Sequence, residues 1–254
     1  MRLVRSISEL RLDGEVGLVP TMGALHAGHV RLFEAARAEN DVVVASLFVN
    51  AAQFDERSDL ARYPRDEERD RAIAERAGVD VLFAPAPEEM YPDGFSTWVE
   101  PDGTGAEGAA RPGHFRGVAT VCLKLFTIVR PARAYFGQKD AQQAIVVRRL
   151  AADLNTGVDV RVVPTVRDDD GLALSSRNAL LSPAERERAL ALPRALQQAA
   201  GAPDPVSAAR AALDGLEPDY VELLRLGGAT LLAAAVRVGS IRLIDNVIVK
   251  GELA

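Results

Sequence analysis

The chain has 254 residues, 48% hydrophobic and 26% charged, which is enough apolar material for one large or two modest globular domains. A formal net charge of −6 disfavours a nucleic-acid partner, including a tRNA-binding role. The single cysteine, Cys122, excludes an intrachain disulfide framework and a multi-cysteine zinc site. The N-terminus meets charged side chains too soon for a signal peptide, and no apolar run approaches the roughly 18 residues of a membrane span. We therefore expect a cytoplasmic protein with no membrane partner.

The first half of the chain alternates strand and helix patterns. Residues 15–21 predict a short buried strand, residues 25–40 a helix, and residues 42–49 a β-branched strand buried on both faces. These three segments make a βαβ unit, which almost always crosses over right-handedly. A charged helix over residues 67–77 and a strand over residues 79–85 continue the alternation.

Residues 91–116 are rich in glycine and proline and predict a long loop. A helix, a strand, a helix and a strand follow it, over residues 117–130, 132–137, 139–154 and 158–166. Such alternation is typical of an open α/β fold. We predict a Rossmann-like parallel sheet with helices on both faces over residues 1–166.

The pattern changes after residue 166. The segments expected there are a turn over 167–171, a helical stretch over 175–200, a helix over 205–216, and strands over 218–226 and 239–249 around an alanine-rich segment. This mixture predicts a smaller C-terminal α+β lid domain over residues 167–254.

The sharpest chemical signal lies between the first buried strand and its helix. His26 and His29 are three residues apart and share a helix face, and Gly28 between them lets a ligand approach the backbone. The first turn of a helix also attracts anions. A lone histidine there would be an ordinary surface residue. The pair around a glycine instead indicates a polyphosphate site with two imidazole donors.

Polar clusters follow two further strands. Asn50 and Gln53 offer neutral amides after the second strand, although such residues also serve as simple turn formers. Lys139 and Asp140 lie at a later strand-to-helix junction beside Gly137. A lysine is scarce in this arginine-rich chain and suits phosphate neutralisation as a compact charge. The alternative is an ordinary exposed Lys–Asp helix start.

A fourth cluster, Ser175, Ser176 and Arg177, lies just past the expected domain boundary. Two hydroxyls and a guanidinium in one loop can clamp a triphosphate, because arginine can fork two oxygens. The alternative interpretation is a helix N-cap formed by Ser176 or Asn178, which stabilises by about 1 kcal/mol.

His-x-Gly-His after the first strand resembles the signature of the nucleotidyltransferase superfamily. Many further motifs occur in the same order as in the pantothenate synthetase (pantoate–β-alanine ligase) family. The chain resembles this family from about residue 15 to the C-terminus. Besides the four clusters, these motifs are YPRD at 63–66, MYPDG at 90–94, RPGHFRGV at 111–118, FGQKD at 136–140 and LSSRN at 174–178.

The resemblance implies a reaction in which pantoate attacks the α-phosphorus of ATP, and β-alanine then attacks the pantoyl adenylate to give pantothenate and AMP. It assigns phosphate stabilisation and catalysis to His26, His29, Lys139, Ser175, Ser176 and Arg177. It assigns further ATP contacts to Met22, Gly28, Gly137, Asp140 and Val166, and the pantoate pocket to Met22, Asn50, Gln53 and Gln143.

The same resemblance implies Mg²⁺ bridging phosphate oxygens, with Asp70 at an acidic position that the family associates with the metal, and a homodimer. Arg111 and His114 match a family loop and are expected to have a supporting role. The sequence leaves open whether residues 55–62 form a mobile flap.

The chain departs from the family pattern at a few positions. Ala51 and Ala52 stand where the family usually has proline and threonine, Leu174 replaces a usual methionine, and Gln138 replaces a usual glutamate. None of these changes removes a predicted phosphate ligand. Two alternatives stay open: another nucleotidyltransferase with a stable nucleotide product, and a nucleotide-binding regulator that has lost turnover.

Overall fold

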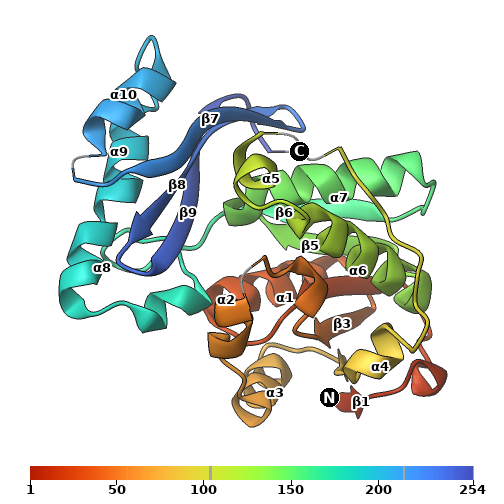
Figure 1. Ribbon diagram of the computed structural model, residues 1–254. Helices are drawn as coiled ribbons and strands as arrows, with labels where there is room; N and C mark the ends of the chain where they lie inside the picture. The colour runs from red at the N-terminus through yellow and green to blue at the C-terminus, as the bar shows by residue number, and fades with distance from the viewer. Residues whose placement is uncertain (56, 103–104, 214, 254) are drawn as a thin grey trace.

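A computed structural model describes residues 1–55, 57–102, 105–213 and 215–253. Six strands form one entirely parallel sheet in the order β1-β4-β3-β2-β5-β6 (Figure 1). Their bounds are β1 (Arg2–Val4), β2 (Val16–Thr21), β3 (Val42–Leu47), β4 (Val81–Phe83), β5 (Arg133–Gly137) and β6 (Asp159–Val163).

Helices cover both faces of this sheet. Helices α1 (Ala27–Glu39) and α3 (Glu67–Arg76) pack on one face, and α6 (His114–Val129) and α7 (Ala141–Asp153) pack on the other. Neighbouring strand residues point to opposite sides: Leu18 joins the core under α6 and α7, and Val19 joins the core under α1. The predicted Rossmann-like sheet with helices on both faces is confirmed.

The strand order reverses at β2, which lies between β3 and β5. Strands β2 and β5 pair only at Gly17–Arg133 and Leu18–Ala134, so they separate toward their carboxyl ends. In open α/β sheets a ligand binds in the crevice at this point of reversal. The turns that follow β2 and β5 therefore face one another across such a crevice.

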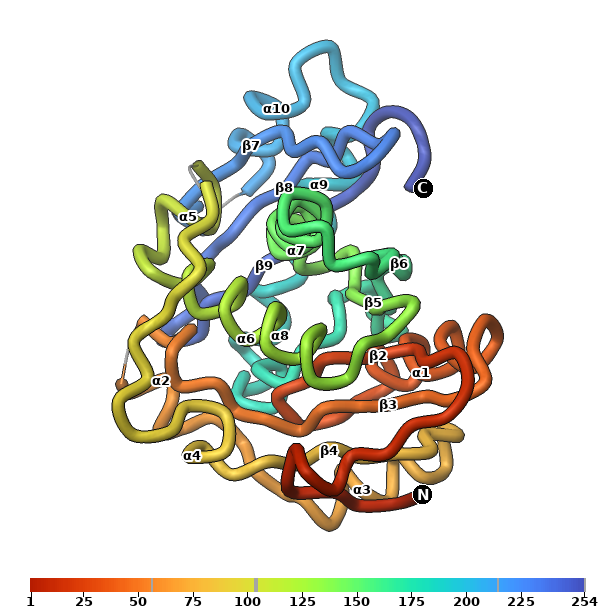
Figure 2. The backbone as a smooth tube through the Cα atoms, turned by 90° about the vertical axis from the view of Figure 1, so that its right-hand side faces the viewer, coloured from red at the N-terminus to blue at the C-terminus, as the bar shows by residue number. Residues whose placement is uncertain are grey.

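The C-terminal part forms an antiparallel sheet, β7-β8-β9, whose outer face is covered by three helices. Figure 2 shows β7 and β8 beyond α7, on the side away from β2 and β3. The bounds are α8 (Pro183–Ala189), α9 (Ala191–Ala199), α10 (Pro205–Ala212), β7 (Pro218–Leu226), β8 (Ala229–Val238) and β9 (Ile241–Lys250). The smaller α+β unit is confirmed, and the division at residue 166 stays a prediction.

Strand β8 corrects the expectation for the alanine-rich segment, which is the central strand of this sheet rather than a spacer between two strands. Alanine has low strand propensity, but β8 is paired on both edges and buried on both faces. Ala234 packs on the helix side, whereas Ala233 and Ala235 pack with Tyr220 toward the first part of the chain.

The prediction of a long loop over residues 91–116 is also partly wrong, since this stretch contains α5 (Ala106–Ala110) and the first residues of α6. Strand β1 and the short helices α2 (Arg57–Arg62) and α4 (Pro87–Met90) were not predicted. The remaining short elements are 3₁₀ turns, η1 (Ile7–Glu9), η2 (Ala51–Gln53), η3 (Gln138–Asp140) and η4 (Ser176–Leu180). No helix in the described part of the chain has the length and apolar composition needed to cross a membrane.

Candidate active site

One cavity at the carboxyl ends of β2 and β5 gathers almost every residue that the sequence singled out. The exceptions are Asp70, Arg111 and His114. The predicted residues that line the cavity are Met22, His26, Gly28, His29, Asn50, Gln53, Gly137, Lys139, Asp140, Gln143, Val166, Ser175, Ser176 and Arg177. The four motif clusters, which come from both parts of the chain, therefore share a single cleft.

The two histidines close the first turn of α1 with a reciprocal cap. The Nδ1 of His26 accepts the N–H of Gly28 at 3.1 Å, and the Nδ1 of His29 accepts the N–H of His26 at 3.2 Å. Each ring therefore carries its proton on Nε2, which is left to donate into the cavity. The ring centroids lie 4.2 Å apart, so one ligand group can meet both.

Both imidazoles are neutral at physiological pH. Burial, with the charge of Lys139 second, lowers the pKa of His26 to about 4. Burial, followed by His26 and Lys139, lowers the pKa of His29 to about 3. The histidines thus act as neutral hydrogen-bond donors, which leaves positive charge to Lys139 and Arg177.

Gly28 is needed for this geometry, because a Cβ atom there would lie 2.8 Å from the Cε1 of His26. Asp70 is 2% exposed and holds the preceding turn by accepting the N–H groups of Ala24 at 2.8 Å and Leu25 at 2.7 Å. Asp70 lines neither of the two principal cavities of the described chain. Its role as a metal ligand stays a prediction, and the carboxylate would have to share or release a backbone hydrogen bond to reach a metal.

Asn50 organises the turn that carries Gln53. The Asn50 Nδ2 donates to Gln53 Oε1 at 3.0 Å and to the carbonyl of Gly117 at 3.1 Å, while Tyr91 donates to Asn50 Oδ1 at 3.0 Å. The Asn50 amide is thus engaged within the protein. A Cβ on Gly117 would lie 2.3 Å from the carbonyl oxygen of Ala52, so only glycine lets α6 approach η2 this closely.

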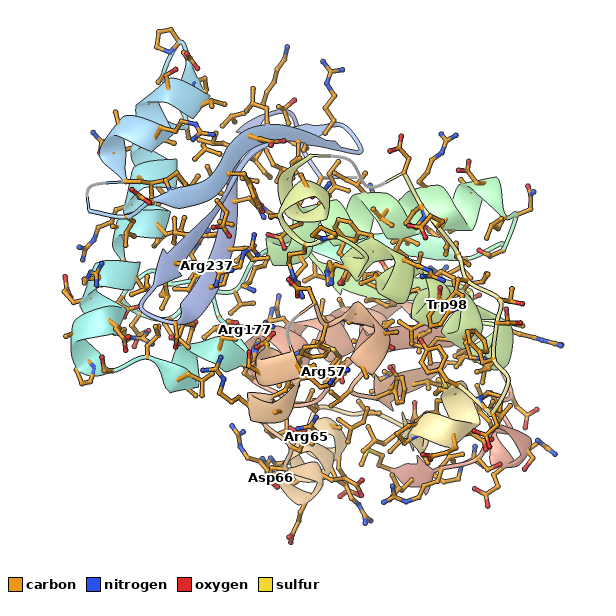
Figure 3. All side chains as sticks on the ribbon, in the orientation of Figure 1. Arg57, Arg65, Asp66, Trp98, Arg177 and Arg237 are labelled. Carbon is orange, nitrogen blue, oxygen red and sulfur yellow. The ribbon has the colours of Figure 1, made fainter. Side chains whose placement is uncertain are left out.

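The serine–arginine loop does contain a helix N-cap, but the capping residue is not the expected Ser176 or Asn178. Its role as a triphosphate clamp stays a prediction. Ser175 is the N-cap of η4, and its hydroxyl accepts the N–H of Arg177 at 3.3 Å. The Arg177 guanidinium lines the cavity and pairs with Asp59 on α2 at 2.7 Å. In Figure 3, Arg177 lies where the C-terminal part meets α2.

Two residues beside this loop were not predicted from the sequence as site residues. Tyr63 is 8% exposed, lines the cavity, and its hydroxyl shares a hydrogen bond with Ser176, while burial raises the pKa of that hydroxyl. Asp59 faces Arg177 from a segment that the sequence left open as a flap. The YPRD motif was the available signal for Tyr63, whereas nothing in the sequence linked Asp59 with Arg177.

A second cavity shares Lys139 and Gln53 with the first and extends toward the β7–β9 sheet. Arg111 lines it and pairs with Asp55 at 2.9 Å, and His114 Nδ1 contacts the carbonyl of Gln53 at 2.8 Å. Burial and the charge of Arg111 lower the pKa of His114 to about 4. Among the described residues, no group of three or more His, Cys, Asp or Glu side chains is placed to hold a metal ion.

Comparison with known proteins agrees with this geometry. A family model described as pantoate-beta-alanine ligase matches residues 1–248. The pantothenate synthetases of Roseiflexus castenholzii and Moorella thermoacetica are similar to the chain. The former is 51% identical over 277 residues, covering 98% of this chain and 100% of the relative. The latter is 52% identical over 257 residues, covering 92% of this chain and 91% of the relative.

Solved structures show the same likeness. Pantothenate synthetase from Thermus thermophilus matches at a TM-score of 0.92 and 47% identity, covering 98% of this chain and 99% of that one. Pantoate-beta-alanine ligase from Francisella tularensis, solved with beta-gamma ATP and beta-alanine, matches at a TM-score of 0.85 and 35% identity, covering 99% of both chains. The chain therefore belongs to the pantoate–β-alanine ligase family.

Proposed function

We propose that the chain condenses pantoate with β-alanine at the expense of ATP, giving pantothenate, AMP and pyrophosphate through a pantoyl adenylate. The observation that carries the proposal is the convergence of His26, His29, Lys139 and the 175–177 loop on one cleft at the point of strand reversal. Family membership names the substrates that such a cleft takes.

In the first step a pantoate carboxylate oxygen attacks the α-phosphorus of ATP, and the bond to the bridging oxygen of pyrophosphate breaks. Lys139 and Arg177 would supply positive charge to the phosphates, and the Nε2–H groups of His26 and His29 would donate to phosphate oxygens. Ser175 and Ser176 are placed to add hydroxyl donors. No protein nucleophile is needed, since the cleft acts by positioning and by charge stabilisation.

In the second step the amine of β-alanine attacks the acyl carbon of the adenylate, and AMP leaves with the oxygen that pantoate contributed. Gln53, Gln143 and Met22 would hold pantoate, and Asn50, which also lines the cavity, would hold Gln53 in place. Gly137 and Asp140 would meet the ribose, and Val166 the adenine. A Cβ on Gly137 would have no neighbour within 4 Å, so this position leaves room for a ligand.

Mg²⁺ belongs to the proposal as part of the MgATP substrate, coordinated chiefly by phosphate oxygens and water. Asp70 is the candidate protein ligand. A cytoplasmic homodimer is also proposed, and the mass of the purified protein in solution tests the dimer.

The test measures two reactions of the purified protein. AMP release should require both pantoate and β-alanine, and exchange of labelled pyrophosphate into ATP should require pantoate alone. Exchange that is independent of pantoate would favour a different nucleotidyltransferase. ATP binding without any AMP release would favour a regulator that has kept the pocket.

A further inference from the structure

A buried asparagine side chain on β9 is hydrogen-bonded to the turn that carries Lys139. Asn246 is 1% exposed. Its Nδ2 donates to the carbonyl of Gln138 at 2.8 Å and to the carbonyl of Lys139 at 3.1 Å. Its Oδ1 accepts from the Gln138 Nε2 at 2.9 Å. Asn246 and Gln138 are 108 positions apart in the chain, so this contact joins the two parts of the molecule.

Few other side chains could make this set of contacts. Two successive carbonyl oxygens need two donors, and the Gln138 amide needs an acceptor. An asparagine amide supplies all three. Aspartate would offer no donor when ionised, and alanine would leave buried carbonyls without a partner, which is unfavourable by about 1–3 kcal/mol per group.

The strand backbone at Asn246 is itself held by neighbouring side chains. The backbone N–H of Asn246 donates to Asp245 Oδ1 at 2.8 Å, and Arg167 forms a bidentate pair with Asp245 at 2.6 and 3.0 Å. Asp245 is 2% exposed. These contacts fix the point on β9 from which the Asn246 side chain reaches η3, and η3 has no side-chain cap of its own.

We propose that Asn246 is a positioning residue for Lys139. By fixing the carbonyls of the turn, it sets where the lysine ammonium meets the phosphates, and it ties that position to the C-terminal part of the chain. The inference rests on the proposed function, because Lys139 acts there on ATP. A misplacement of about 1 Å in such a site can lower a rate by about 10²-fold.

The experiment measures pantoate-dependent pyrophosphate exchange in Asn246→Ala and in the milder Asn246→Ser. We expect kcat to fall about 10-fold or more in the alanine variant and less in the serine variant, because serine keeps one donor. The KM for pantoate should change less than about 2-fold, because pantoate is held by the η2 turn. In a Lys139→Ala background, adding Asn246→Ala should lower the rate less than about 2-fold further, because the residue acts through the lysine.

Asn40→Ala is the matched control. Its Nδ2 also makes two buried hydrogen bonds, to Ala36 and to Tyr135, but it lines neither cavity of the described chain. This variant should lose thermal stability and keep its kcat.

Independent, multiplicative losses from Lys139→Ala and Asn246→Ala would overturn the inference, as would wild-type kcat in Asn246→Ala. Failure of both Asn246 variants to fold would also overturn it, because the contact would then hold the fold rather than the lysine. Absence of pantoate-dependent exchange in the unchanged protein would instead overturn the proposed function.

Discussion

His26 and His29 each use one ring nitrogen for the fold and leave the other for a ligand. The Nδ1 atoms accept backbone N–H groups at the start of α1, so the tautomer with Nε2–H is selected before any substrate binds. The motif is therefore both a helix cap and a pair of preorganised donors. These two contributions can be separated by substitution at a single position.

Replacing His26 with asparagine should keep the helix cap while removing the Nε2–H donor. An Asn side chain can still accept the Gly28 N–H, but it does not reach as far as an imidazole Nε2. We expect His26→Asn and His26→Ala both to lower adenylate formation about 10²-fold. Only the alanine variant should lose about 1 kcal/mol of folding free energy. Pyrophosphate exchange and urea unfolding check the pair, and equal destabilisation by both substitutions would remove the capping role.

At the scale of elements, the pantoate turn depends on how closely η2 and α6 approach. The Ala51–Ala52 pair removes a rigid turn and a hydroxyl that the family usually has. The backbone of this turn is nonetheless held by Asn50, whose amide bonds Gln53 and the carbonyl of Gly117. Packing of η2 against Gly117 thus stabilises a turn whose own alanines do little to restrict its backbone conformation.

Gly117→Ala should displace this turn. The added Cβ would meet backbone atoms of Ala52 and Gln53, none of which belongs to a flexible side chain. We expect the pantoate KM to rise about 10-fold or more while the ATP KM changes less than about 2-fold, since the change removes binding of one substrate. Gly201→Ala is the control, because a Cβ there meets nothing within 4 Å. An equal rise in the KM values of both substrates would show that this turn is not part of the pantoate pocket.

The contact between α2 and η4 supports a second prediction at this scale. Arg177 pairs with Asp59 at 2.7 Å, and the Asp59 carboxylate both occupies the guanidinium and repels an incoming triphosphate. Asp59→Asn should therefore tighten ATP binding, by about 1.4- to 5-fold for an ion pair of about 0.2–1 kcal/mol. Calorimetric titration with ATP measures it. Asp153→Asn, which removes a pair with Arg149 outside the cavity, should leave the affinity unchanged, and weaker binding in Asp59→Asn would contradict the argument.

The elements that the sequence predicted well are those with strong periodicity. The run from Val42 is buried on both faces of the parallel sheet, so its β-branched side chains identified it. Strand β8 was missed because its alanines suit close packing between two layers, which only the tertiary fold reveals. Helix α5 was hidden in a glycine-rich stretch and is held by distant partners, Gln142 and Glu222.

For the whole molecule, the site was predictable where it follows directly from strand ends. The turns after β2, β3 and β5 meet because the strands are parallel neighbours, and motif order along the chain sufficed to find them. The contacts of Asp59 with Arg177 and of Asn246 with Gln138 join residues more than a hundred positions apart. No local pattern encodes such contacts, since they depend on how the C-terminal sheet docks.

The same burial that keeps the histidines neutral makes the whole molecule sensitive to acid. All three histidines of the chain have a pKa lowered by burial, to about 4 for His26, about 3 for His29 and about 4 for His114. In the unfolded chain they would titrate near about 6.5, so the unfolded state binds more protons below that pH. Stability is therefore full above about pH 6.5 and falls as the pH drops from about 6.5 to about 4 for His26 and His114, and to about 3 for His29.

Unfolding by urea at pH 7.5 and at pH 5.5 tests this expectation. Each histidine contributes a loss of up to about 1.4 kcal/mol over that interval, and carboxylates with ordinary pKa values hardly titrate in it. His26→Asn keeps the cap but removes one titrating group. Between pH 7.5 and 5.5 this variant should therefore lose less unfolding free energy than the unchanged protein, and the difference should be about the contribution of one histidine. Stability that stays constant or rises between pH 7.5 and 5.5 would show that the histidines are not held neutral by burial, and the donor roles assigned to His26 and His29 would then need charged rings.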